Sequence, residues 1–117
     1  MPRTTIAVQE NGAAVTYQGV SAAAVLDRAG APLGHALTGA ALSTYVRAIG
    51  SDGYEAVFSL AELDPAMTSN EILIADLADG KAIDAPRGPL RIIAPHDARP
   101  ARSVRTLIRL DVGRTQE

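Results

Sequence analysis

Arginine side chains near the C-terminal end have the clearest potential for chemistry. Residues 87–117 carry seven arginines against three acidic residues, a net charge of +4, whereas residues 1–86 carry four cations against ten acidic residues, a net charge of −6. A guanidinium group grips a phosphate or a carboxylate through two parallel hydrogen bonds. This asymmetry predicts an anion-binding surface near the C-terminal end, in a chain whose total net charge is only −2.

These arginines follow a short apolar stretch, residues 90–94, which predicts a strand. Its alternation would place Arg91 and Ile93 on one face and Leu90, Ile92 and Ala94 on the other. The segment after it carries His96, Asp97, Arg99, Arg102 and Arg105. Pro95 and Pro100 stiffen this connection because proline fixes the backbone angle φ. A strand that is followed by a stiff, cationic connection has its end facing either solvent or an anion.

Two interpretations of the arginines stay open at this level. If residues 104–110 form a strand, Arg105 and Arg109 lie on the same face, because side chains alternate with a period of two. Beside a stiff loop, these guanidinium groups would hold a small anion. The other interpretation is a solvated edge strand that charged side chains protect from pairing with another chain.

Other site chemistries lack their motifs. His35 and His96 stand 61 residues apart, so no metal-binding spacing is present. The sequence contains no cysteine, no G-x-S-x-G motif and no glycine-rich phosphate loop. Nucleic-acid binding is disfavoured because the net charge is negative and the arginine-rich segment lacks aromatic residues for base stacking. No apolar run approaches the length of about 18 residues that a membrane span needs, and the N-terminus lacks the apolar core of a signal peptide.

Turn signals and apolar periodicity divide the chain into short elements. Asx-Gly pairs at residues 11–12, 52–53 and 79–80 predict hairpins, because both residue types tolerate positive φ. Ser21 predicts a helix N-cap and Gly30 a helix end. We expect strands at residues 4–8, 14–17, 40–49, 54–60, 72–77, around 83, 90–94 and 104–112, with a short turn at 60–63 that Ser59 caps.

Together these elements predict a single domain, residues 1–117, of the α+β class. The hairpins favour a mixed, largely antiparallel sheet with one main helix. Only four residues are aromatic, namely Tyr17, Tyr45, Tyr54 and Phe58. The core must therefore be built from Ala, Val, Leu and Ile.

Four motifs occur in series along the chain. They are VTYQGVSAAAVLDRAGAPLG, DGYEAVFSLAEL, ILIADLADGKAI and GPLRIIAPHDARPARSVRTLIRLDV. The ordered set resembles the oxidoreductase molybdopterin-binding domain of the sulfite oxidase family, over about residues 14–112. Matching positions include Gly19-Val20, Asp52-Gly53-Tyr54, Asp79-Gly80-Lys81, Gly88-Pro89-Leu90-Arg91 and Arg102-Ser103-Val104-Arg105. The resemblance implies a sulfite oxidase-like fold core.

It also implies a cofactor and the residues that contact it. In that family the segment after the matching strand lies against the pterin and its phosphate, so the resemblance assigns Arg102, Ser103 and Arg105 to an anionic pterin or another small anion. His96 and Arg99 occupy the loop between. Molybdopterin is the implied cofactor, and a chain without a cofactor is the alternative. We expect Arg102→Ala and Arg105→Ala to change the free energy of unfolding by under about 1 kcal/mol if both residues serve a ligand.

The family holds its molybdenum with one cysteine thiolate upstream of the first matching stretch, and this sequence has no cysteine. We therefore expect a molybdopterin-binding, oxidoreductase-like domain that lacks the ligand for autonomous redox catalysis. The alternative is a non-catalytic binding or interaction module that keeps the fold without a cofactor and contacts a protein partner. The resemblance allows a periplasmic or a cytoplasmic location.

Overall fold

The structure, a computed structural model, describes residues 1–115. Its strands are β1 (Thr4–Glu10), β2 (Ala13–Ser21), β3 (Thr44–Gly50), β4 (Glu55–Ser59), β5 (Leu73–Ala78), β6 (Lys81–Ala82), β7 (Arg91–Ile93) and β8 (Leu107–Arg114). One α-helix, α1 (Ala22–Arg28), is joined by four short 3-10 helices, η1 (Gly34–Ala36), η2 (Gly39–Ser43), η3 (Ala61–Leu63) and η4 (Pro100–Arg102). The predicted α+β class with one main helix is confirmed.

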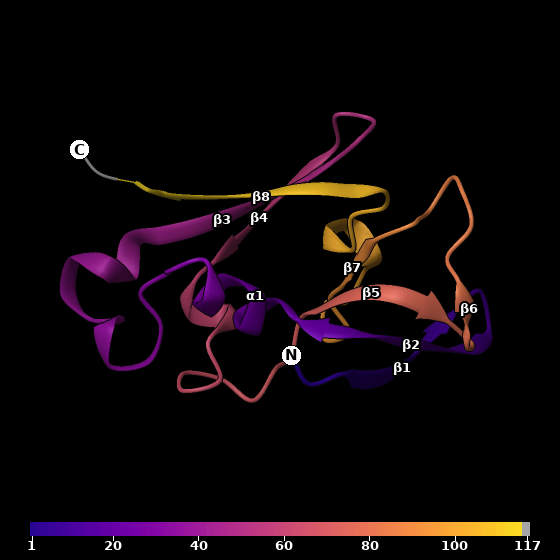
Figure 1. The fold of residues 1–117 in the computed structure, drawn as a ribbon, viewed down its shortest axis with the longest axis horizontal. Coiled ribbons are helices and arrows are strands. Elements are labelled where there is room, and N and C mark those ends of the chain that lie inside the picture. The colour runs from indigo at the N-terminus through magenta and orange to yellow at the C-terminus, as the bar shows by residue number, and fades with distance from the viewer. Residues whose placement is uncertain (116–117) are drawn as a thin grey trace.

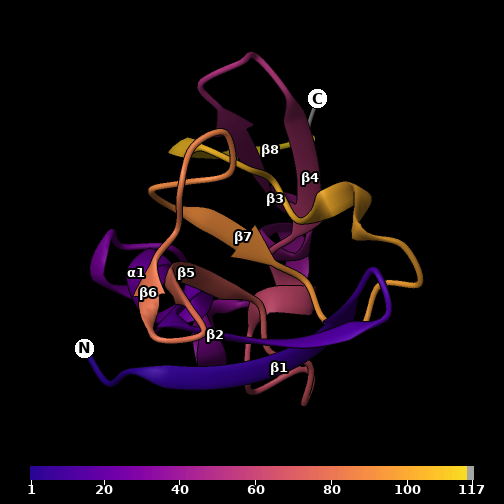
Figure 2. The same ribbon diagram turned by 90° about the vertical axis from the view of Figure 1, so that its right-hand side faces the viewer.

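The strands form two sheets, and every pairing among residues 1–115 is antiparallel. One sheet, called the lower sheet, has the order β1-β2-β5-β6, with β7 also paired to β5. The other, called the upper sheet, has the order β4-β3-β8. Figure 1 and Figure 2 show the second sheet lying over the first. The sequence predicted one mixed sheet instead. The chain divides because α1, η1 and η2 carry it away from β2 before β3 begins, so the β3–β4 hairpin starts a second layer.

The hairpin turns follow the Asx-Gly signals. Asn11 and Gly12 have φ values of 52° and 82°, and Asp79 and Gly80 have values of 51° and 80°. Left-handed values at both central positions suit a type I′ turn, whose twist matches that of the paired strands. In the β3–β4 turn Gly53 is left-handed, at 89°. The three predicted hairpins are therefore confirmed.

Helix α1 begins and ends close to the predicted residues. The Ser21 hydroxyl accepts a hydrogen bond from the Ala23 amide at 3.2 Å, and Gly30, with φ of 91°, turns the chain away after the last helical turn. Leu26 of this helix belongs to the same buried cluster as Val46 and Phe58 of the upper sheet. The helix has seven residues, and no helix in the described part of the chain is long and apolar enough to cross a membrane.

Strand β7 contributes to two separate buried clusters. Ile92 belongs to the cluster between the sheets, whereas Ile93 packs with Tyr17 and Leu73 on the opposite face of the lower sheet. This alternation is the one predicted for residues 90–94, because successive side chains of a strand point to opposite faces. This second cluster lies beside the candidate functional site that is described below.

Residues 40–43 are not part of a strand, contrary to the prediction for residues 40–49. They belong to η2, and β3 begins at Thr44. The Ser43 hydroxyl donates to the Ala40 carbonyl at 2.9 Å, a local side-chain bond of the kind that competes with a sheet ladder. From Thr44 onward the period of two holds, and alternate residues of β3 are buried.

Strands β2 and β5 approach very closely at Gly19. The register between the strands shifts between Gln18 and Gly19, and a Cβ atom on Gly19 would lie 1.9 Å from the Ile74 carbonyl oxygen. Any side chain at this position therefore forces the two central strands of the lower sheet apart.

We predict that Gly19→Ala lowers the free energy of unfolding by about 3 kcal/mol or more, because its methyl group collides with backbone rather than with a flexible side chain. Gln18→Ala, at the neighbouring half-buried position, should change it by less than about 1 kcal/mol. Urea denaturation followed by circular dichroism measures both variants. Equal stability of the two would show that the strands relax around the added methyl group.

Candidate functional site

A polar cavity opens between β1 and the segment that follows β7. Its volume is about 510 Å³, and residues 7–11 and 93–105 form most of its wall. The charged side chains that line it are Arg87, Arg91, Arg99 and Arg105, together with Glu10 and Asp97. Four guanidinium groups against two carboxylates make the cavity a region of positive potential.

Arg91 is the buried cation of this site, with only 3% of its surface exposed. Its Nη1 donates to Glu10 Oε2 at 3.0 Å and to the Tyr17 hydroxyl at 2.8 Å. Its Nε donates to the Ser103 carbonyl at 3.4 Å. These contacts satisfy a charge that burial alone would make unfavourable, and they tie β1, β2 and the segment after β7 together.

Tyr17 completes the network around Arg91. Its hydroxyl accepts the bond from Arg91 and donates to Glu10 Oε1 at 2.8 Å. The Arg91 guanidinium also lies 5.6 Å from the centre of the Tyr17 ring, within range of a cation–π interaction. Burial, and after it the hydrogen bond to Glu10, raises the pKa of Tyr17. The phenol therefore stays protonated and serves as a donor at neutral pH.

Arg99 and Arg105 are the exposed arginines of the cavity. Within residues 1–115, neither has a carboxylate at salt-bridge distance. Arg87 is only partly paired. Its Nη1 lies 3.8 Å from Glu10 Oε1, and Arg91 also binds this carboxylate. Among the described residues, the cavity thus presents two guanidinium groups without a bound carboxylate, beside a third that shares its partner.

The backbone that carries Arg105 is firmly held. Thr106 has φ of 49°, a left-handed value that is strained for a β-branched residue and persists only where its surroundings enforce it. The Thr106 amide donates to the Arg87 carbonyl at 2.8 Å, and the Ser51 amide donates to the Thr106 carbonyl at 2.9 Å. These bonds position Arg105 at the cavity wall before any ligand binds.

Ser103 lines the cavity and is also structural. Its hydroxyl, on a residue 9% exposed, accepts a hydrogen bond from the Ala94 amide at 3.0 Å. This bond stabilises the turn of the chain after β7. The hydroxyl keeps its own hydrogen for donation, so Ser103 retains the capacity to contact an anion in the cavity.

Arg102 is placed in a different environment from Arg105. Its Nε and Nη2 donate to the two carboxylate oxygens of Asp97 at 3.0 and 2.9 Å, and its Nη1 donates to the Glu62 carboxylate. Its guanidinium lies over the Phe58 ring, 4.4 Å from the centre. The hydrogen bonds to Asp97 outweigh the effect of burial and, with those to Glu62, raise the pKa of Arg102. Arg102 therefore holds the fold together, and the structure does not bring it to the cavity with Arg105.

His96 and Arg109 also stand apart from the cavity. His96 is exposed and is not among the described residues that line it. Arg109 binds Asp111 at 3.0 Å on the outer face of β8. The predicted shared face of Arg105 and Arg109 is wrong, because β8 begins only at Leu107 and the left-handed Thr106 interrupts the alternation.

Three cavity residues, Glu10, Arg87 and Arg91, were not predicted as site residues from the sequence. Glu10 and Arg91 are 81 residues apart, and only the successive pairings of β1 with β2, β2 with β5 and β5 with β7 bring them together. One signal was present. An arginine inside the apolar stretch of residues 90–94 needs a buried partner, because arginine is almost never fully buried unless it is paired.

No protein-family model matches this chain, and no curated protein matches it significantly. The chemistry of the site is therefore the basis for a functional inference. Among the residues that the structure describes, no group of three or more His, Cys, Asp or Glu side chains is arranged to hold a metal ion. Guanidinium groups with free donors, a serine hydroxyl and a concave wall are suited to binding an anion.

We predict that Arg91→Met lowers the free energy of unfolding by about 3–5 kcal/mol, because Glu10 then keeps a partly buried charge without its cation. The double variant Arg91→Met with Glu10→Met should recover a large part of that loss, since no unpaired charge remains. Urea denaturation of the single and double variants measures the coupling. Simple additivity of the two single losses would contradict a direct interaction.

We further predict that Arg102→Ala costs about 1–3 kcal/mol of stability, because two carboxylates and an aromatic ring lose their shared partner. Arg105→Ala should stay within about 0.5 kcal/mol of the parent chain. Chemical denaturation of both variants under one set of conditions separates the two roles. A loss for Arg105→Ala as large as that for Arg102→Ala would show Arg105 to be structural as well.

Proposed function

We propose that this chain is a binding domain for a small anionic ligand, and that the ligand is an anionic pterin of the molybdopterin class. The observation that carries the proposal is the polar cavity to which Arg99 and Arg105 contribute guanidinium groups that no carboxylate within residues 1–115 neutralises. The resemblance to the sulfite oxidase family suggests that the ligand is a pterin. The cavity itself supports only the inference that the ligand is negatively charged.

The size of the cavity and its donors suit a ligand with a phosphate group. Its volume of about 510 Å³ lies in the range of roughly 300–1,000 Å³ that is usual for small-molecule sites. Arg99 and Arg105 approach from the arginine-rich segment, and the Ser103 hydroxyl lies between them in the sequence. Charge-assisted bonds of this kind gain strength where a concave wall excludes water.

The donors fit the phosphate end of a molybdopterin and do not fit its metal end. The sequence has no cysteine, so this chain cannot provide the thiolate with which the family holds molybdenum. A bound molybdenum cofactor would supply two-electron redox chemistry, and we derive no redox step for the residues of this chain. Their role in the proposal is to bind and orient the phosphate.

A non-catalytic interaction module that keeps the fold without a cofactor is the second candidate function. The observation that favours it is the environment of Arg102. The resemblance assigns this arginine to the pterin, yet its guanidinium is bound by Asp97 and Glu62. In this case, Arg99 and Arg105 would contact the acidic surface of a protein partner.

Two measurements test the proposed function. The chain is first produced in a host that synthesises molybdopterin, and the co-purified pterin is quantified by its fluorescence. Calorimetric titration with inorganic pyrophosphate then probes the cavity directly. We expect both ligands to bind and the double variant Arg99→Ala with Arg105→Ala to lose at least about tenfold in pyrophosphate affinity, the effect of roughly 1.4 kcal/mol.

Arg28→Ala with Arg114→Ala is the matched control, because it also removes two positive charges and both arginines are exposed and outside the cavity. Equal losses in the control and in the double variant would indicate general electrostatic attraction and contradict a built site. Pyrophosphate binding without any co-purified pterin would support the anion site and overturn the pterin as its ligand. Binding of neither would overturn the proposal in favour of the interaction module.

A further inference from the structure

A smaller hollow, with a volume of about 290 Å³, adjoins the polar cavity. Four of the residues that line it also line the polar cavity, namely Arg91, Pro100, Ser103 and Arg105. The β3–β4 hairpin contributes two further lining residues, Asp52 and Tyr54. The upper sheet thus brings a carboxylate and an aromatic ring to a wall that the polar cavity shares.

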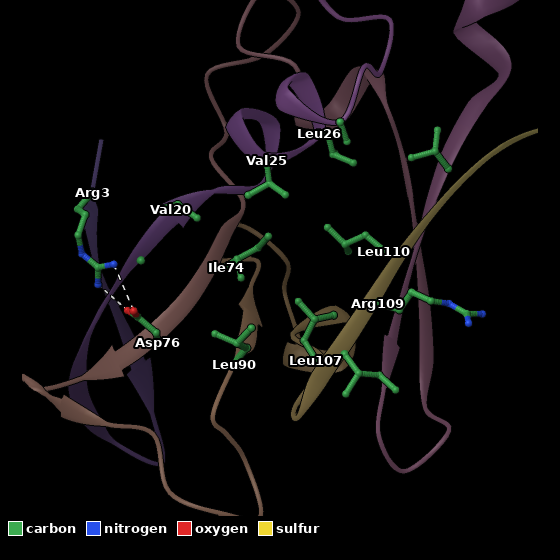
Figure 3. Close-up of a pocket in the computed structure, with 14 residues that line it drawn as sticks. Arg3, Val20, Val25, Leu26, Ile74, Asp76, Leu90, Leu107, Arg109 and Leu110 are labelled. Atoms are coloured by element: carbon green, nitrogen blue, oxygen red, sulfur yellow. Dashed lines mark hydrogen bonds and ion pairs between the residues drawn. The ribbon is translucent and has the colours of Figure 1, made fainter. Parts of the chain in front are cut away.

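The cavity and the smaller hollow form one polar region. Left-handed Thr106 separates Arg105 from Leu107. Figure 3 shows Leu107 pointing into an apolar cleft between α1 and β8, whose other walls include Val25 and Ile74. Arg105 lines both the polar cavity and the smaller hollow, whereas Leu107 lines neither. A ligand that contacts Arg105 is therefore within reach of both polar spaces and is separated from the apolar cleft.

The hairpin turn places Asp52 beside the backbone of Arg105. The Ser51 amide donates to the Thr106 carbonyl, which binds the turn to this corner of the chain. A Cβ atom on Gly50 would lie 2.7 Å from the Arg105 carbonyl oxygen and 2.9 Å from Asp52 Oδ1. These two oxygens therefore converge on one point of the turn. The Asp52 carboxylate is positioned before any ligand binds.

Tyr54 forms a fixed wall of the smaller hollow. Its hydroxyl donates to the Ala101 carbonyl, and its amide donates to Asp52 Oδ1 at 3.0 Å. The residue is 48% exposed, so packing in the core does not account for its position. An exposed aromatic ring that is held at its hydroxyl offers a stacking surface to a planar group at a low cost in side-chain ordering.

Asp52 gives the smaller hollow a charged hydrogen-bond acceptor. The Tyr54 amide bonds only its Oδ1 oxygen. Within residues 1–115, no cation lies at salt-bridge distance from this carboxylate. A carboxylate next to Arg105 repels a second anionic group and attracts an N–H donor. The hollow therefore selects for a different chemical group from the one that the polar cavity selects.

We propose that the ligand of the polar cavity carries, beside its anionic group, a planar nitrogen heterocycle with an amino group. The heterocycle stacks on the Tyr54 ring, and the amino group donates a hydrogen bond to Asp52. The ligand passes Arg105 and Ser103, which line both the cavity and the hollow. This inference rests on the proposed function, because it requires the anionic group to lie in the polar cavity.

Calorimetric titration with guanosine monophosphate (GMP) and inosine monophosphate (IMP) tests the proposal. The two nucleotides share the phosphate, the sugar and the fused rings, and only GMP has the exocyclic amino group. We expect the parent chain to bind GMP about tenfold more tightly than IMP, the effect of one hydrogen bond to a charged acceptor. Tyr54→Leu should weaken the binding of both nucleotides by at least about fivefold, because the stacking surface is lost.

Asp52→Asn separates selection by this carboxylate from general electrostatic attraction. The asparagine oxygen can still accept the bond from the Tyr54 amide, whereas an NH₂ group replaces Oδ2. We expect this variant to lose the preference for GMP over IMP. It should bind pyrophosphate about twofold more tightly, because the negative charge beside Arg105 is gone. Glu55→Gln is the matched control, since Glu55 is an exposed carboxylate of the same hairpin outside both polar spaces, and it should keep the preference for GMP.

The outcomes distinguish failure of this inference from failure of the proposed function. Equal affinity of the parent chain for GMP and IMP, together with binding of pyrophosphate, would overturn the heterocycle and leave the anion site in place. A folded Asp52→Asn variant that keeps the preference for GMP would also overturn it. Binding of neither pyrophosphate nor a nucleotide would overturn both proposals. The comparison of GMP with IMP uses the parent chain, so it does not depend on the folding of any variant.

Discussion

A buried guanidinium group is the constraint on which the rest of this structure depends. Arg91 is almost fully buried, and its charge is tolerable only while Glu10 and Tyr17 bind it. Strand β7 has three residues and pairs with β5, and the network joins it also to β1 and β2. Because the cavity wall continues directly from β7, the same network determines where that cavity opens and which side chains reach it.

The arginines of the C-terminal segment divide according to their partners. Arg91 and Arg102 bind carboxylates inside the protein and stabilise the fold, whereas Arg99 and Arg105 have no such partner within residues 1–115. The positive potential of the cavity is what remains after the internal pairs have formed. Segment charge alone therefore overstates the number of residues available to a ligand, and the pairing of each guanidinium decides its role.

The polar cavity and an apolar cleft between α1 and β8 meet at one backbone corner. Left-handed Thr106 separates Arg105, on the wall of the polar cavity, from Leu107, on the wall of the apolar cleft. Main-chain bonds from Thr106 and Leu107 to Arg87 and Leu90 hold this corner.

The sequence by itself determined the hairpin turns, the start and end of α1 and the alternation of β7. Asn11-Gly12, Ser21 and Gly30 act on their immediate neighbours, and such signals need no distant contact. Only the tertiary structure decided the rest: the division into two sheets, the partnership of Arg91 with Glu10, and the separation of Arg102 from Arg105. Burial and pairing decide the role of an arginine, and both depend on residues far away in the chain. Arg102 and Arg105 are three positions apart and are alike in the sequence. They differ in the fold because Asp97 and Glu62 bind the guanidinium of Arg102.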